Sequence, residues 1–83
     1  MRYQVFIHES LLDSAPKSRA ERRRVMEFVR WLGEHPFIQG DYTESDEVGQ
    51  RREVKIVGRY AVTFWADHAV KEVKVTNIQI ADL

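Results

Sequence analysis

Cationic and aromatic side chains occur together in the second half of the sequence. Successive side chains of a strand point to opposite faces of its sheet. The alternation in this half therefore predicts a sheet face that carries Arg51, Lys55 and Lys74 together with either Phe64 or Trp65. Since cations bind phosphates and aromatic rings stack on bases, that face has the composition of a nucleic-acid contact. The alternative is an ordinary solvated face whose charges form ion pairs.

The charges are distributed unevenly along the chain, although the formal net charge is zero. Residues 17–30 hold six basic and two acidic side chains, whereas residues 34–53 hold six acidic and two basic ones. The basic segment is either a solvated helix face or a surface that binds a polyanion. The neutral total and the acidic segment weigh against strong non-specific binding to nucleic acid.

The sequence contains no pattern of metal ligands. The chain has no cysteine, which excludes disulfides and Cys-based zinc or iron sites. Its three histidines, His8, His35 and His68, are scattered, and no pair has the spacing of a metal site. We therefore expect no metal and no cofactor. His68 follows Asp67 in a predicted turn, where it is either a proton-transfer group or a solvated turn residue.

The composition predicts one folded, soluble domain. The chain has 83 residues, of which 43% are hydrophobic and 11% aromatic, and this is enough for a small packed core in a single domain spanning residues 1–83. No apolar run has the length of a signal peptide or of a membrane span. We expect a cytoplasmic protein that makes no contact with a membrane.

The elements that position these side chains begin with a strand and two helical segments. Residues 2–8 alternate as a strand does, and residues 9–13 predict a short helical turn. Ser18 and Glu21 fit a capping box that opens a longer helix, although an earlier start with Pro16 in the first turn fits equally well, and Gly33 and Pro36 end it. The apolar stripe of this helix consists of Val25, Phe28, Val29 and Leu32.

The rest of the chain predicts a meander of strands at residues 51–57, 60–66 and 71–80, while residues 41–45 are either a short polar strand or a loop. Gly58 stands where a hairpin turn needs a positive φ, and the mixed pattern of the last strand is compatible with a β-bulge. The predicted fold is α+β in the order β-α-α-β-β-β, with or without one more strand. Two N-terminal helices pack on one face of a mostly antiparallel, twisted sheet.

This order of elements and several phrases of the sequence resemble the RelE/ParE toxin superfamily of bacterial type II toxin–antitoxin systems, some of which serve plasmid stabilisation. The phrases are "YQVFIHESLL", "RVMEFVRWLGEHP", "REVKIVGRYAVTFWAD" and "KEVKVTNI". The resemblance covers most of the chain and implies a single RelE-like domain.

RelE-like members of this superfamily cut messenger RNA on the ribosome without a metal, by driving the ribose 2′-hydroxyl at the adjacent phosphate. This chemistry needs cations that stabilise the charge of the transition state. The resemblance makes Lys55 and Arg59 the candidate catalytic residues, because Lys55 matches the basic strand of the nucleases. Arg59 lies two residues before Ala61, which stands where the nucleases commonly carry an arginine. Residues 81–83 also lack the arginine that commonly follows the last strand.

The candidates for RNA binding are the cations of the predicted strands, namely Arg51, Arg52, Lys55 and Lys74. Arg52 is expected on the same face as Val54 unless the strand is bulged. The sequence leaves open whether these cations replace the two absent arginines or whether the protein is an inactive relative of the nucleases.

The resemblance also implies a partner, a short cognate antitoxin that wraps the toxin with a helix or a strand. The candidates for this contact are Trp31, Phe37 and the acidic segment 41–47. Aromatic anchors dominate many protein interfaces, but such residues are equally ordinary at the edge of a core.

The sequence admits three functions. The first is a toxin that inhibits translation by ribosome-dependent mRNA cleavage, an mRNA interferase whose partners are the ribosome and mRNA. The second is a non-nuclease protein, either a ParE-like inhibitor of DNA gyrase or an inactive relative that binds a partner. The third is a structural or interaction module, for example a homodimer.

Overall fold

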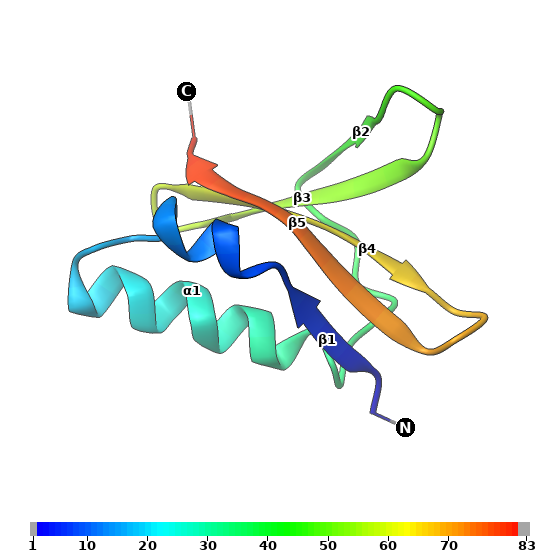
Figure 1. Cartoon of the computed structure of the whole chain (residues 1–83), viewed down its shortest axis with the longest axis horizontal. Coiled ribbons are helices and arrows are strands. Elements are labelled where there is room, and N and C mark those ends of the chain that lie inside the picture. Colours follow the sequence, from blue (N-terminus) through cyan, green and yellow to red (C-terminus); the bar gives the residue numbers. More distant parts are fainter. Residues whose placement is uncertain (1, 82–83) are drawn as a thin grey trace.

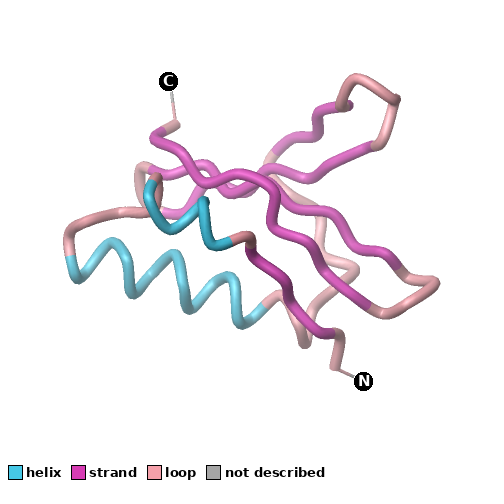
Figure 2. Tube along the Cα trace, viewed as in Figure 1, coloured by secondary structure: helices cyan, strands magenta, loops and turns pink. Residues whose placement is uncertain are grey.

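The computed structural model describes residues 2–81, which form a five-stranded sheet with its helical segments on one side (Figures 1 and 2). Along the chain the elements are β1 (Gln4–Ile7), the 3-10 helix η1 (Glu9–Asp13), α1 (Arg19–Trp31), β2 (Tyr42–Ser45), β3 (Arg51–Val57), β4 (Tyr60–Asp67) and β5 (Glu72–Ile80). The α+β class expected from the sequence is confirmed. The polar segment 41–45 forms a strand rather than a loop, because β2 pairs with β3.

The helix α1 follows the local signals of the sequence closely. The Ser18 side chain accepts a hydrogen bond from the Glu21 backbone N–H at 3.5 Å, which confirms Ser18 as the N-cap. The Glu21 carboxylate, the other half of the predicted capping box, binds Arg59 instead. Val25, Val29 and Leu32 are buried, so one face of the helix packs on the sheet as the apolar stripe predicts. Within residues 2–81 no helix is both long enough and apolar enough to cross a membrane.

The prediction of two N-terminal helices is wrong for the first of them. Glu9–Asp13 forms a 3-10 helix of five residues rather than an α-helix. Its backbone hydrogen bonds join residues three apart, from the Leu11 N–H to the His8 carbonyl at 2.9 Å and from the Ser14 N–H to the Leu11 carbonyl at 3.2 Å. The segment buries none of its residues and is too short to sustain an α-helix.

The strands lie in the order β1-β5-β4-β3-β2. β1 runs parallel to β5, and the other neighbouring pairs are antiparallel, which confirms a mostly antiparallel sheet. The register between β4 and β5 shifts between Thr63 and Phe64, so that Thr76 of β5 has no direct partner. This shift is a β-bulge in the last strand, where the mixed sequence pattern allowed one.

Phe64 and Trp65 point to opposite faces of the central strand β4. The Phe64 ring packs edge-on against Phe28 of α1 with the ring centroids 5.9 Å apart, and only 2% of Phe64 is exposed. Phe64 therefore belongs to the core between the sheet and α1, together with Tyr60 and Val62 of β4 and Val73, Val75 and Ile78 of β5. Trp65 lies on the other face, which α1 and η1 do not cover (Figure 1); we call this face the open face.

Candidate functional site

The strand register decides on which face of the sheet each cation lies. Directly paired residues on neighbouring strands share a face. Lys55 of β3 pairs with Val62, a core residue on the helix side, whereas Lys74 of β5 pairs with Trp65 on the open face. The prediction that Lys55 and Lys74 share one face is therefore wrong.

The error arises in β3, which carries apolar residues on both faces. The sequence pattern suggested that Val54 and Ile56 turn toward the helices. Instead Val54 pairs with Thr63 and Ile56 pairs with Ala61 on the open face, where Val54 is buried. Because a shift of one residue exchanges the two faces of a strand, Lys55 turns to the helix side.

On the helix side, Lys55 lies beside a groove between α1 and β3, which we call the helix groove. The groove has a volume of about 520 Å³ and is lined by Arg24, Glu27, Phe28, Trp31, Ile38, Lys55 and Val57. It combines apolar side chains with charges of both signs. This composition suits a protein segment with apolar side chains better than a uniformly negative phosphate backbone.

Lys55 itself is bound by a carboxylate. Its Nζ lies 3.2 Å from Oδ1 of Asp41, and Oδ2 of Asp41 accepts a hydrogen bond from the Ile56 N–H at 2.7 Å. The hydrogen bond from Ile56, followed by the one from Lys55, lowers the pKa of the Asp41 carboxyl below its ordinary value. A carboxylate with a lowered pKa is a weak base, so this pair in its closed form offers neither a proton acceptor nor a free cation.

Arg59, the other candidate catalytic residue, is bound to α1. Its Nε and Nη2 donate hydrogen bonds to Oε2 and Oε1 of Glu21 at 2.6 and 3.0 Å, the two-point geometry in which arginine recognises a carboxylate. The hydrogen bonds from Arg59 lower the pKa of the Glu21 carboxyl. The pair joins the β3–β4 turn to the first turn of α1, and a catalytic role of Arg59 stays a prediction that requires the pair to open.

The predicted interface aromatics, Trp31 and Phe37, are both stacked on histidines. Trp31 stacks on His35 with the ring centroids 4.0 Å apart and the planes at 17°. Phe37 stacks on His68 at 4.4 Å and 6°. Nδ1 of His68 lies 2.9 Å from the Tyr3 hydroxyl, so His68, which is exposed in the β4–β5 turn, is also held in an aromatic cluster.

The open face carries a row of two aromatic rings with a lysine between them. Lys74 Nζ lies 4.9 Å from the centroid of the Trp65 ring, and Phe6 of β1 is the direct neighbour of Lys74 on the other side. The charge of Lys74 is shared with Asp67 and Glu72, each 3.8 Å away. Sequence reasoning missed Phe6, although the alternation of the first strand already placed it on the polar face of that strand.

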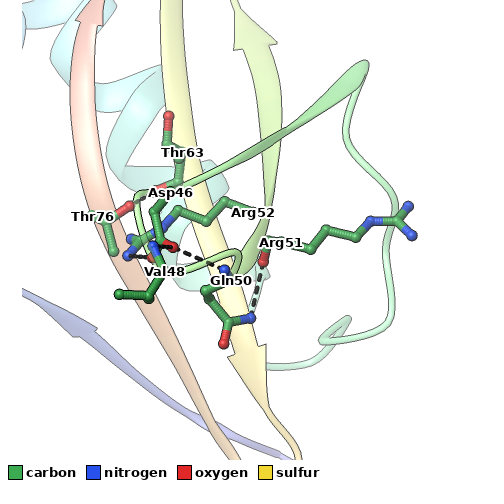
Figure 3. A network of polar contacts seen from close by, with 7 residues as sticks. All are labelled: Asp46, Val48, Gln50, Arg51, Arg52, Thr63 and Thr76. Atoms are coloured by element: carbon green, nitrogen blue, oxygen red, sulfur yellow. Dashed lines mark hydrogen bonds and ion pairs between the residues drawn. The ribbon is translucent and has the colours of Figure 1, made fainter.

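Arg51 and Arg52 leave β3 in opposite directions (Figure 3). Arg52 shares the open face with Val54, as expected for a strand without a bulge at this point. Its Nη2 donates to Oδ2 of Asp46 at 2.8 Å, while its Nε is buried without a hydrogen-bond partner within residues 2–81. Arg51 turns to the helix side, where its Nε lies 3.3 Å from Oε2 of Glu53.

Each of the five predicted site cations is therefore paired with a carboxylate. The pairs are Arg51–Glu53, Arg52–Asp46, Lys55–Asp41, Arg59–Glu21 and Lys74 with Asp67 and Glu72. Sequence reasoning missed these partner carboxylates. The sheet brings cations and aromatic rings to its surface, but their charge is neutralised locally.

Two further positions bear on the nuclease resemblance. Ala61 is buried on the open face between Ile56 and Gln79, so an arginine at this position would stand on the open face. At the C-terminus, the Ala81 N–H donates to the Arg59 carbonyl at 2.8 Å, and residues 82–83 lie outside the described residues.

In the part of the chain that the structure describes, no group of three or more His, Asp and Glu side chains is arranged to hold a metal ion.

No protein-family model matches the sequence, and no curated protein matches it at a significant level. Among solved structures, the fold matches a chain in the crystal structure of the archaeal RelE–RelB complex from Pyrococcus horikoshii OT3, with a TM-score of 0.72. The match covers 96% of this chain and 96% of that chain, at 23% sequence identity. The likeness shows that the chain has the RelE-like fold that the sequence phrases imply.

Proposed function

We propose that this protein is the toxin-like component of a type II toxin–antitoxin module of the RelE/ParE superfamily. The observation that carries the proposal is the RelE-like fold, which extends over 96% of both chains of the match. The phrases of the first strand, the helix and the last three strands resemble the same superfamily.

The partner in this proposal is a cognate antitoxin that binds the helix groove through Trp31, with Phe37 beside it. The matched structure is a complex of RelE with RelB. Trp31 and Phe37 are 39% and 74% exposed, and Ile38 lines both the helix groove and a neighbouring hollow next to Phe37. Exposed aromatic rings beside an apolar hollow are typical anchors of a protein interface.

The first candidate action is inhibition of translation by mRNA cleavage on the ribosome. Lys55 and Arg59 then supply the cations at the reacting phosphate, and Arg51, Arg52 and Lys74 contact the RNA backbone. The RNA phosphates have to displace the carboxylates of Asp41 and Glu21. Ion pairs at the protein surface are weak, so a phosphate held close to these side chains can replace a carboxylate.

The second candidate is a non-nuclease toxin, for which DNA gyrase is a target, or an inactive relative that binds only a partner protein. The opposite faces of Lys55 and Lys74 favour it, because the predicted RNA-binding cations do not lie on one surface of the sheet. Ala61 favours it as well, since the open face lacks the arginine of the nucleases.

Assays with purified protein separate these actions. The protein is added to a coupled translation extract, where intact and cleaved messages are resolved on a gel, and in parallel to DNA gyrase in a supercoiling assay. Message cleavage that requires ribosomes supports the first candidate, and loss of supercoiling supports the second. Failure of the purified protein to bind the product of the adjacent gene contradicts the toxin–antitoxin proposal itself.

A further inference from the structure

The cations without a carboxylate partner gather on and beside α1. Within residues 2–81, seven Lys and Arg side chains make no ion pair, and six of them lie between residues 17 and 30. These are Lys17, Arg19, Arg22, Arg23, Arg24 and Arg30, and the seventh is Lys71. The unneutralised positive charge of the described residues therefore lies on the helix and not on the sheet.

Four of these side chains form one face of α1. Arg19, Arg22, Arg23 and Arg30 occupy the positions i, i+3, i+4 and i+11, a stripe about 100° wide on a helix that turns by about 100° per residue. All four are exposed. At about 100° per residue, the centre of the stripe lies about 100° around the helix from the buried positions Val25, Val29 and Leu32, so the stripe flanks the packed side of the helix. We call it the arginine face.

At its N-terminal end this arrangement of charge works against the stability of the helix, whereas Arg30 in the last turn complements the helix dipole. Arg19 is three and four residues from Arg22 and Arg23, and like charges at these spacings destabilise a helix. Cations in the first turn also oppose the helix dipole. The exposed Glu27 on the same side makes no ion pair with any described residue. Positive charges that destabilise their own helix indicate a role in binding an anion.

We propose that the arginine face binds the phosphate backbone of double-helical RNA without reading its sequence. The helix has 13 residues and spans about 20 Å at about 1.5 Å per residue, which is long enough to contact several phosphates. Guanidinium groups recognise phosphate oxygens by two parallel hydrogen bonds. A-form RNA has a deep and narrow major groove, which brings its two rows of phosphates close enough for one straight arginine face to contact both.

The contact surface continues beyond the C-terminal end of α1. Arg30 and Arg2 line a hollow of about 430 Å³ together with Tyr3, Gln4, Val5, Phe6 and Gly33. Arg2 is paired with Glu34 at 2.8 Å, so Arg30 supplies the free positive charge at this end of the face.

Other occupants fit the arginine face less well. A protein partner needs apolar or aromatic anchors, and Met26 is the apolar side chain within the stripe. A second copy of the chain would offer its acidic segment, but Asp41, Asp46 and Glu53 are already paired with cations of the same chain, which leaves Glu44 and Glu47 as its carboxylates without an ion pair within residues 2–81. Single-stranded RNA binds through stacking on aromatic rings, which this face lacks.

The inference goes beyond the proposed function, because it concerns a different surface and does not require toxicity. The test is fluorescence anisotropy of a labelled RNA duplex of mixed sequence and about 16 base pairs, titrated with the purified full chain at several salt concentrations. Four arginine–phosphate contacts predict a slope of log K against log salt of about −3 to −4. Arg23→Gln is expected to weaken binding and to make this slope shallower by about one, whereas Arg23→Lys retains the slope.

Lys71→Gln is the matched control, because it removes one unpaired positive charge from the β4–β5 turn, outside α1. It is expected to leave the affinity and the slope unchanged. Arg30→Gln is a second test variant in case Arg23→Gln does not fold, and circular dichroism verifies the fold of each protein.

The proposal is overturned if the wild-type protein does not bind the duplex at about 50 mM salt, or if Lys71→Gln weakens binding as much as Arg23→Gln. Equal affinity for a DNA duplex of the same sequence overturns the assignment to RNA. Displacement of the RNA by poly-glutamate at an equal concentration of charge assigns the face to acidic proteins and overturns the proposal as well.

Discussion

Phe64 and Trp65 are adjacent in sequence but lie on opposite faces of the sheet, so replacing each by alanine tests the assignment of those faces. Phe64→Ala removes a ring that is 2% exposed and packs against Phe28. Truncation of such a core ring costs about 3–5 kcal/mol. Trp65→Ala loses an exposed cation–π contact with Lys74, worth about 0.5–1 kcal/mol. The partly buried area of the Trp65 ring adds a similar amount.

These magnitudes are measurable in a domain of this size. At about 0.05–0.15 kcal/mol per residue, a chain of 83 residues has a free energy of unfolding of about 4–12 kcal/mol. Phe64→Ala therefore removes a quarter or more of the stability, and Trp65→Ala, at about 1–2 kcal/mol, removes less than Phe64→Ala. Urea denaturation followed by far-ultraviolet circular dichroism gives both values, and Phe64→Leu serves as a milder variant in case Phe64→Ala does not fold.

An equal loss of stability in both alanine variants would refute the assignment of the two faces, as would a larger loss in Trp65→Ala. The assignment of Lys55 and Lys74 to opposite faces would be refuted as well, because it follows from the register of β3 and β5 against β4.

Three further predictions concern Asp46 in the β2–β3 turn, the helix groove and the candidate catalytic lysine. The pKa of the Asp46 carboxyl is lowered in the folded state, mainly by the hydrogen bond from Arg52. The ionised carboxylate therefore stabilises the fold at pH values above its ordinary pKa of 3.8. This contribution is lost as the pH falls through the lower pKa that the carboxyl has in the folded state. Asp46→Asn is therefore less stable at neutral pH but loses less stability on acidification in urea titrations, and equal acid sensitivity of both proteins would contradict this. Trp31→Ala weakens binding of the adjacent gene's product by about 30-fold in titration calorimetry, the loss of one interface anchor of about 2 kcal/mol. Val48→Ala, at an exposed position of the β2–β3 turn, leaves that affinity unchanged, and an unchanged affinity in Trp31→Ala removes Trp31 from the interface. Lys55→Ala abolishes message cleavage in a translation extract, and retained cleavage excludes Lys55 as the catalytic cation.

The sequence predicted α1 well because the signals of a helix are local. Ser18 caps the helix by accepting from the Glu21 backbone N–H, and the apolar stripe spans about two turns. The β3–β4 hairpin was predictable for the same reason, since Gly58 adopts the positive φ, 63°, that its turn requires. Neither feature depends on distant parts of the chain.

The faces of β3 were not predictable, because they depend on the register against β4. Val54 and Ile56 gave β3 a clear alternation, but Val57 on the opposite face also packs against the core. Alternation shows which side chains share a face and does not show which face meets the helix. The wrong choice placed Lys55 beside Lys74 on a surface that the two do not share.

The ion pairs were not predictable either, because their partners are distant in sequence. Arg59 and Glu21 are 38 residues apart, and Lys55 and Asp41 are 14 residues apart. The sequence shows an acidic segment and basic strands, but it does not show which carboxylate reaches which cation. The cations that the sequence assigned to RNA are therefore the ones that form ion pairs within the chain. The unpaired arginines of α1 could not be told from an ordinary solvated helix face by sequence alone.

The central claim, that this protein acts as the toxin of a toxin–antitoxin module, is tested most directly by bacterial growth after induced expression, alone and together with the adjacent gene. We predict that the protein alone arrests growth and that co-expression of its neighbour restores it, while the core variant Phe64→Ala has no effect on growth. Undiminished growth of cells that contain the wild-type protein in folded, soluble form would contradict the claim.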